Sequence, residues 1–145
     1  MPSSPPALAA LAPGLSAAGK LDRGDIEALA GAGVRTIVNN RPDDEDPGQL
    51  PAAEARRIAQ SHGIAYHHIP VTAATLSRAD VDAFAAVLAS APQPVVVHCR
   101  SGTRSTLLWA LTRLGEGADP AALVAEAARH GIDIAALPAI AARLG

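Results

Sequence analysis

The segment Pro94–Ser105, with the sequence PVVVHCRSGTRS, constrains the fold most, because it joins a strand to a helix around one thiol. Its β-branched run, Val95–Val97, predicts a buried parallel strand. After a polar turn, apolar residues recur at helical spacing from Leu107 to Leu114. Cys99, the only cysteine of the chain, therefore lies between the carboxyl end of a strand and the amino end of a helix.

This position of Cys99 indicates nucleophilic chemistry. Backbone N–H groups and the helix dipole stabilise an anion at a helix amino terminus. Such surroundings can lower the pKa of a thiol from about 8.5 to roughly 3.5–7.5. A free cysteine is often just a small buried hydrophobe, but the polar and cationic residues beside Cys99 favour a reactive thiolate.

Strand and helix patterns alternate along the chain, which predicts an α/β fold of three layers, with a largely parallel central sheet flanked by helices. We expect one domain over residues 1–145, with an irregular segment at 1–14. Strands are expected at 15–20 (an edge strand), 34–38, 64–69 and 95–97. Helices are expected from 22 to about 31, from 51 to 62, from 77, after 105, from 119 to 129 and from 133.

Composition excludes several classes of protein. The net charge of −2 and the three aromatic residues give no sign of nucleic-acid binding. No apolar stretch has the length of a membrane span. A single cysteine suits a reducing cytoplasm, and the amino terminus lacks the basic start of a signal peptide. We therefore expect a cytoplasmic protein without nucleic-acid or membrane partners.

The loop after Cys99 has the residues of an anion-binding cradle. Gly102 can adopt a positive φ and turn successive N–H groups inward. Arg104 offers a planar fork of donors for an oxyanion, and its place in the first turn of a helix opposes the dipole, which favours such a role. Arg100 is equally well explained as a residue that binds the ligand at the rim of the site or as a simple surface charge. Ser101 and Thr103 complete the predicted anion-binding loop.

Three further residues are candidates for supporting roles. Ser105 could hydrogen-bond the thiolate or cap the helix. His98 precedes the nucleophile on the strand and so faces the opposite side of the sheet, where orienting the loop backbone is a better role than acting as a base. Arg41, just after a strand, either faces the same cleft or forms a surface salt bridge with the acidic run 43–46. One member of that run could be an acid, although a solvated loop is the simpler reading.

No metal or cofactor is expected. His67 and His68 lie on a strand without the accompanying cysteine or carboxylate spacing of a metal site.

These residues resemble known thiolate families. His98-Cys99-x-x-Gly102 is similar to the phosphate loop of protein tyrosine and dual-specificity phosphatases, and the run 66–71, YHHIPV, resembles the strand before their acid loop. Over nearly the whole chain, GVRTIVNNRPDDE, IPV and HCRSGTRSTLLWAL resemble the bacterial DUF442 group, the phosphatase-like domain of beta-lactamase-hydrolase-like proteins. The resemblance implies a dual-specificity-phosphatase-like fold. Some members are fused to a persulfide dioxygenase-like domain, which implies functional coupling to such an enzyme.

Two departures from the phosphatase pattern bear on function. Phosphatase loops have five residues between cysteine and arginine, whereas four separate Cys99 from Arg104, so that Ser105 stands where the phosphatase arginine would. The four-residue spacing and the string CRSGTRS are similar to the active loop of rhodanese sulfurtransferases. The general acid that follows the Ile-Pro-Val stretch by two residues in phosphatases is replaced by Ala73.

Sulfur transfer needs only a thiolate and a good leaving group, whereas phosphomonoester cleavage needs a proton donor. We therefore expect first a rhodanese-type sulfurtransferase, in which Cys99 carries a persulfide between a small-molecule sulfur donor and an acceptor thiol. The alternative is a phosphatase-like hydrolase that forms a phosphocysteine, with Arg104 or Arg100 holding the phosphoryl oxygens. A non-catalytic thiol or anion sensor is a third possibility.

Overall fold

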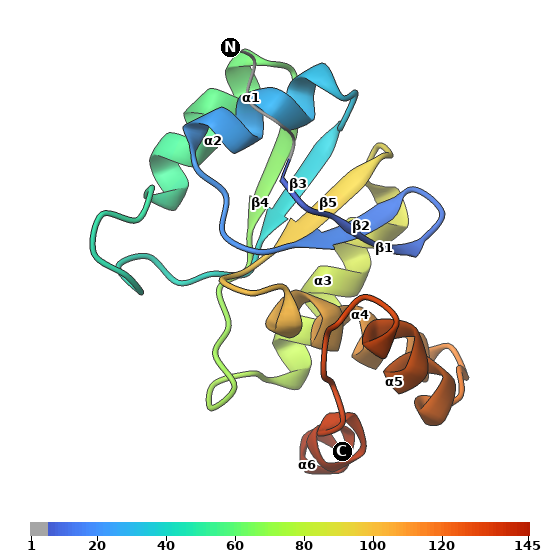
Figure 1. The fold of residues 1–145 in the computed structure, drawn as a ribbon. Coiled ribbons are helices and arrows are strands. Elements are labelled where there is room, and N and C mark those ends of the chain that lie inside the picture. Colours follow the sequence, from blue (N-terminus) through green and yellow to red (C-terminus); the bar gives the residue numbers. More distant parts are fainter. Residues whose placement is uncertain (1–5) are drawn as a thin grey trace.

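A computed structural model describes residues 6–145 and gives the order of elements along the chain (Figure 1). The strands are β1 (Ala9–Ala12), β2 (Leu15–Ala18), β3 (Thr36–Asn39), β4 (Ala65–His68) and β5 (Val95–His98). The helices are α1 (Arg23–Gly31), α2 (Ala52–Ser61), α3 (Arg78–Ser90), α4 (Thr103–Gly115), α5 (Pro120–Ala128) and α6 (Leu137–Leu144). Within these residues, no helix has both the length and the apolar character needed to cross a bilayer.

The five strands form one mostly parallel sheet with the order β1-β2-β5-β3-β4. Strand β5 is central and runs parallel to both β2 and β3, so that Val96 lies opposite Ser16 on one side and Ile37 on the other. Only β1 is antiparallel, and it pairs with β2 at the edge. The predicted α/β architecture with a largely parallel sheet is confirmed.

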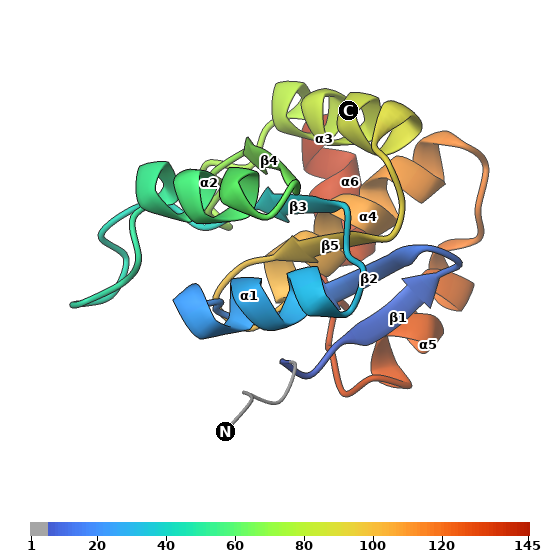
Figure 2. The same ribbon diagram turned by 90° about the horizontal axis from the view of Figure 1, so that it is seen from above.

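Helices cover both faces of the sheet, and the alternation of side chains along β5 separates two cores. Val95 and Val97 pack into the core beneath α3, α4, α5 and α6, whereas Val96 packs into the core beneath α1 and α2. Figure 2 shows these two helical layers on opposite sides of the sheet. A strand buried on both faces explains why 95–97 is an unbroken β-branched run.

The amino-terminal part differs from the expectation. Residues 9–12 form strand β1, although 1–14 was expected to be irregular, and β2 is consequently an inner strand instead of an edge strand. The run AALA has no β-branched residue, so only its antiparallel pairing with β2 across Pro13-Gly14 reveals it. Residues 1–5 of the expected irregular segment lie outside the described residues.

The last helix also begins later than expected, at Leu137 instead of near 133. The Asp133 side chain accepts a hydrogen bond from the Ala135 amide at 2.9 Å and so supports a turn before the helix.

The carboxyl ends of the parallel strands bring four loops to one edge of the sheet. The Asn40 amide donates to the His98 carbonyl at 2.8 Å, and the Lys20 amide donates to the Arg100 carbonyl at 3.1 Å. The Val71 amide donates to the Asn40 carbonyl at 3.0 Å. These bonds tie the loop that follows β5 to the loops that follow β2, β3 and β4, which is where ligands bind in open α/β sheets.

Candidate active site

Cys99 lies at the centre of this edge, in the loop between β5 and α4. Its thiol is free, and the residue is fully buried. The Gly102 amide donates a hydrogen bond to the Cys99 sulfur, with an N···S distance of 3.1 Å. Gly102 is also the N-cap of α4 and has a φ of 94°, a left-handed conformation that turns its N–H toward the sulfur. The loop thus has the inward-facing donor expected of an anion cradle.

Gly102 offers a direct test of the cradle. In Gly102→Ala, the positive φ strains the alanine and should lower the free energy of unfolding by about 1–2 kcal/mol. Relief of this strain should turn the amide away from the thiol, since the left-handed conformation is the one that directs the amide to the sulfur. Gly33→Ala is the matched control, since Gly33 has a φ of 91° and open space around it. We expect both variants to be less stable in urea unfolding and only Gly102→Ala to lose turnover. Equal turnover in the two variants would mean that the amide plays no part.

The Arg104 side chain extends from the first turn of α4 to the loops that follow β3 and β4. Its Nη1 donates to the Val71 carbonyl at 2.9 Å, and its Nη2 donates to a carboxylate oxygen of Glu45 at 2.8 Å. Burial lowers the pKa of Arg104, but the hydrogen bond to Glu45 and the charge and hydrogen bond of Cys99 together raise it above its usual value. Arg104 is therefore a charged group next to the nucleophile, as expected from the sequence.

Two carboxylates of the loop after β3 connect the arginines. Glu45 accepts from Arg104 and from Nε of Arg41 at 2.9 Å. Asp46 bonds Arg41 and also accepts from Nε of Arg100 at 3.0 Å. The hydrogen bond from Arg104, followed by that from Arg41, holds the pKa of Glu45 below its usual value against the opposing effect of burial. Glu45 is consequently an anion in the free protein.

This network bears on the alternatives that the sequence left open for Arg41 and for the acidic run. Arg41 does form salt bridges with the acidic run, but its side chain is buried and not on the surface. Arg100 is exposed, with 62% of its side chain accessible, and its described ion pair is with Asp46. The acidic run is not a purely solvated loop, because Glu45 and Asp46 bind arginines and Asp43 accepts from the Ala52 amide at 2.8 Å.

The hydroxyl groups near the loop contribute less than expected. The Ser105 hydroxyl donates to the Asn40 side-chain oxygen at 2.8 Å in the protein interior, so its described partner is neither the thiol nor a backbone amide of the helix. The Ser101 hydroxyl donates to that of Thr103 at 3.2 Å on the exposed side of the loop. The position of the phosphatase arginine is thus filled by a structural serine.

His98 lies on the face of the sheet covered by α1 and α2, as the alternation along β5 predicts. Burial lowers the pKa of His98 to about 4, with a backbone hydrogen bond of Cys99 acting in the opposite direction. Within residues 6–145, its Nδ1 atom is buried and has no hydrogen-bond partner. His98 is therefore a neutral residue behind the loop at neutral pH.

The lowered pKa of His98 makes stability depend on pH. Between its ordinary value of 6.5 and about 4, the unfolded chain binds a proton that the folded protein excludes, so stability falls as the pH falls. Urea unfolding should show a loss of about 2 kcal/mol between roughly pH 7 and pH 5 from this group. His98→Gln should flatten the pH dependence, whereas His62→Gln, which removes an exposed histidine, should retain it. A wild-type slope in His98→Gln would contradict the assignment.

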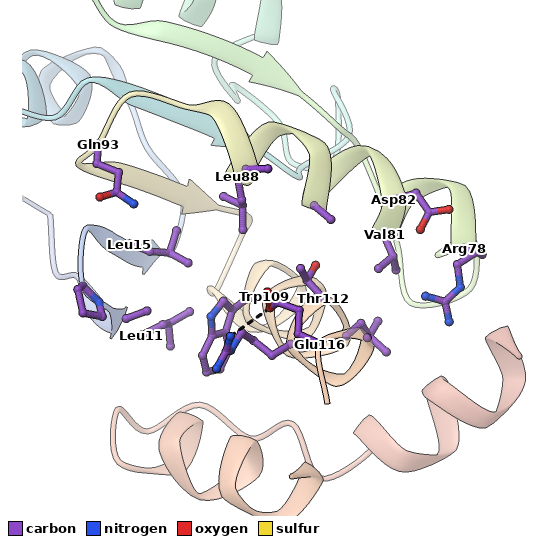
Figure 3. A pocket seen from close by; sticks show the side chains of 17 residues that line it. Leu11, Leu15, Arg78, Val81, Asp82, Leu88, Gln93, Trp109, Thr112 and Glu116 are labelled. Atoms are coloured by element: carbon purple, nitrogen blue, oxygen red, sulfur yellow. Dashed lines mark hydrogen bonds and ion pairs between the residues drawn. The ribbon is translucent and has the colours of Figure 1, made fainter. Parts of the chain in front are cut away.

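A wide apolar pocket lies elsewhere, between α3, α4 and the β1–β2 hairpin, where Figure 3 shows Leu15, Leu88 and Trp109 lining the hollow. Its described lining contains neither Cys99 nor Arg104. Because the candidate nucleophile is not in this pocket, we place the active site at the loop that contains Cys99. In the described part of the chain, no three His, Cys, Asp or Glu side chains gather as metal ligands would.

Comparison with known proteins identifies the family. The family model described as "Beta-lactamase hydrolase-like protein, phosphatase-like domain" matches residues 7–116. The chain belongs to this family. A beta-lactamase hydrolase-like protein of Agrobacterium fabrum is 34% identical over 123 residues, a match that covers 84% of this chain and 28% of the relative. The chain thus spans less than a third of the length of this curated relative.

Solved structures agree with the family. A suspected phosphatase from Neisseria meningitidis is 31% identical, with a TM-score of 0.83 over 93% of this chain and 96% of that chain. The kinase-associated phosphatase, which is 16% identical, has a TM-score of 0.73 over 92% and 90% of the two chains and so shares the fold. The beta-lactamase hydrolase-like family therefore has a phosphatase-like fold here, as the resemblance in sequence implied.

These findings favour a different function from the one placed first in the sequence analysis. They support an enzyme of the phosphatase-like type, and they give no support to a rhodanese-type sulfurtransferase. A salt bridge of Arg41 with the acidic run 43–46 was among the expectations, and the i,i+4 spacing of Arg41 and Glu45 is a signal for it. The contacts of Glu45 with Arg104, of Asp46 with Arg100 and of Asn40 with Ser105 were not expected.

Proposed function

We propose that the chain hydrolyses phosphomonoesters through a covalent phosphocysteine at Cys99. The observation that carries the proposal is the buried thiol that accepts a hydrogen bond from the Gly102 amide, at 3.1 Å from the sulfur, with the Arg104 guanidinium near enough to act on its electrostatics. A phosphoryl group attacked by this thiolate develops negative charge on its oxygens. Donors fixed beforehand at the place where charge develops lower the barrier of such a step.

The residues of the loop have distinct roles in this reaction. Cys99 attacks phosphorus, and the ester oxygen leaves as an alcohol. Arg104 binds the phosphoryl oxygens with the donors of its planar fork. Gly102 and the amino terminus of α4 stabilise the thiolate before attack and after its release. Water then cleaves the phosphorus–sulfur bond and restores Cys99.

Sulfur transfer remains a second candidate because of one observation. Arg104 is the fifth residue after Cys99, one position earlier than in phosphatase loops, and this spacing resembles rhodanese loops. In that reaction Cys99 would carry a sulfur atom as a persulfide and pass it to an acceptor thiol. The fold and the family are the reasons to place phosphate hydrolysis first.

Two assays on the purified chain separate the candidates. We expect hydrolysis of para-nitrophenyl phosphate and, at most, a trace of thiocyanate from thiosulfate and cyanide. The same preparation of Cys99→Ser controls for contaminating phosphatases. Efficient sulfur transfer without ester hydrolysis would replace the proposed function by the second candidate.

A further inference from the structure

Hydrolysis of a phosphomonoester needs a proton for the departing oxygen, and the structure offers a candidate source for it in the acidic run 43–46. A positioned acid contributes about 10²–10⁴-fold to such a step. Position 73, two residues after Val71, is an alanine and provides no acid. The carboxylate hydrogen-bonded to Arg104 belongs instead to Glu45, which lies 59 residues away in sequence.

We propose that Glu45 is the general acid of the reaction, and then the general base that activates water. This assignment rests on the proposed function. The Arg104 guanidinium binds the Glu45 carboxylate at 2.8 Å, and it is close enough to Cys99 for the two groups to influence each other electrostatically. A phosphoryl group held by Arg104 and attacked by Cys99 would therefore lie next to the Glu45 carboxyl group, within reach of its leaving oxygen.

Binding of the substrate explains how an ionised carboxylate becomes an acid. In the free protein, Arg104 and Arg41 hold the pKa of Glu45 down. A phosphoryl dianion takes up the donors of Arg104 and adds negative charge beside Glu45, and both changes raise the pKa of the carboxyl group. The described contacts place one further charged carboxylate in this network, Asp46 on the same loop, which binds Arg41 and Arg100.

The two steps balance without any co-reactant except water. In the first, the Cys99 sulfur bonds to phosphorus as the bond from phosphorus to the ester oxygen breaks, and the Glu45 proton moves to that oxygen. In the second, Glu45 takes a proton from water as the water oxygen attacks phosphorus. The phosphorus–sulfur bond breaks, the thiolate is restored, and inorganic phosphate leaves.

The other acidic groups near this edge are less suited to the role. Asp46 is bound by Arg41 and Arg100 and, among the described contacts, makes none with Arg104. The Asp43 carboxylate accepts a hydrogen bond from the Ala52 amide at the start of α2. Asp44 is exposed. His98 lies on the opposite face of the sheet.

The test compares two esters that differ in their need for a proton. The phenolate ion is a poor leaving group and needs a proton from an acid, whereas dinitrophenolate leaves without protonation. Glu45→Gln should lower kcat for phenyl phosphate by about 10²–10⁴-fold and affect 2,4-dinitrophenyl phosphate far less. The decline of wild-type kcat at high pH, where the acid is ionised, should also disappear in the variant. Asp44→Asn removes the same charge from the same loop and should behave as wild type with both esters.

Each other outcome overturns the assignment. Equal losses with both esters would mean that Glu45 only positions Arg104. A gain with both esters would mean that Glu45 competes with the substrate for the arginine. If the wild-type protein hydrolyses neither ester, the proposed function itself fails, and the role of Glu45 fails with it.

Discussion

Cys99→Ser is expected to abolish ester hydrolysis, with a loss of about 10⁴-fold or more, because the hydroxyl group is a far weaker nucleophile than the thiolate. The change is nearly isosteric and leaves the hydrogen bond from Gly102 a suitable acceptor. We therefore expect an unchanged circular dichroism spectrum and retained binding of inorganic phosphate. The measurement is the initial rate with para-nitrophenyl phosphate.

Ser90→Ala is the control for this substitution, because Ser90 is exposed at the end of α3, where its hydroxyl group bonds only to the helix backbone among the described contacts. It should retain the wild-type rate. Residual hydrolysis by a folded Cys99→Ser protein at more than a small fraction of the wild-type rate would exclude the thiol as the nucleophile.

Arg104→Lys is expected to lower kcat by about 10²–10³-fold, the usual effect of losing a donor to a developing oxyanion. Lysine keeps the positive charge, but it has no planar fork that can bond the Val71 carbonyl and also present further donors to the phosphoryl oxygens. The effect should appear in kcat more than in KM, because charge grows on the oxygens in the transition state. The measurement is the steady-state rate with para-nitrophenyl phosphate.

Arg113→Lys provides the comparison, since Arg113 forms an exposed ion pair with Glu116 on the last turn of the same helix. This variant should be indistinguishable from wild type. Wild-type kinetics in Arg104→Lys would show that only the charge of Arg104 matters, and Arg100 would become the next candidate for binding the oxyanion.

The elements of the fold that are encoded locally were predictable. The run Val95–Val97 indicates a strand buried on both faces, and the helices expected from 22 and from 77 are present, with Asp22 and Ser77 as their N-caps. Strand β1 was not predictable in this way, because its four residues form a strand only by pairing with β2. Local patterns thus identify elements whose own residues stabilise them.

The nucleophile was also predictable, whereas its surroundings were not. Cys99 is marked by its own neighbours in sequence. By contrast, the bonds from Arg104 to Glu45 and from Ser105 to Asn40 join residues that are 59 and 65 positions apart. No periodicity or spacing shows which of four acidic residues at 43–46 meets the arginine, because the sheet brings the two loops together.

The sequence led us to place sulfur transfer first because of the spacing between the cysteine and the arginine. Four residues between Cys99 and Arg104, and an alanine at position 73, favoured sulfur transfer in the sequence analysis. Under the proposed function both features are offset, since Glu45 brings a carboxylate from another loop to Arg104. On this account, a residue missing from an expected position is replaced by one from elsewhere in the chain.

The identity of the group carried by Cys99 tests the proposed function most directly. Wild-type protein would be mixed with 2,4-dinitrophenyl phosphate, quenched in acid within a turnover and digested, and the peptide containing Cys99 would be weighed by mass spectrometry. A parallel sample would be treated with thiosulfate. The proposal predicts a peptide heavier by one phosphoryl group in the first sample and unchanged in the second. A peptide that gains a sulfur atom from thiosulfate, and nothing from the ester, would contradict it.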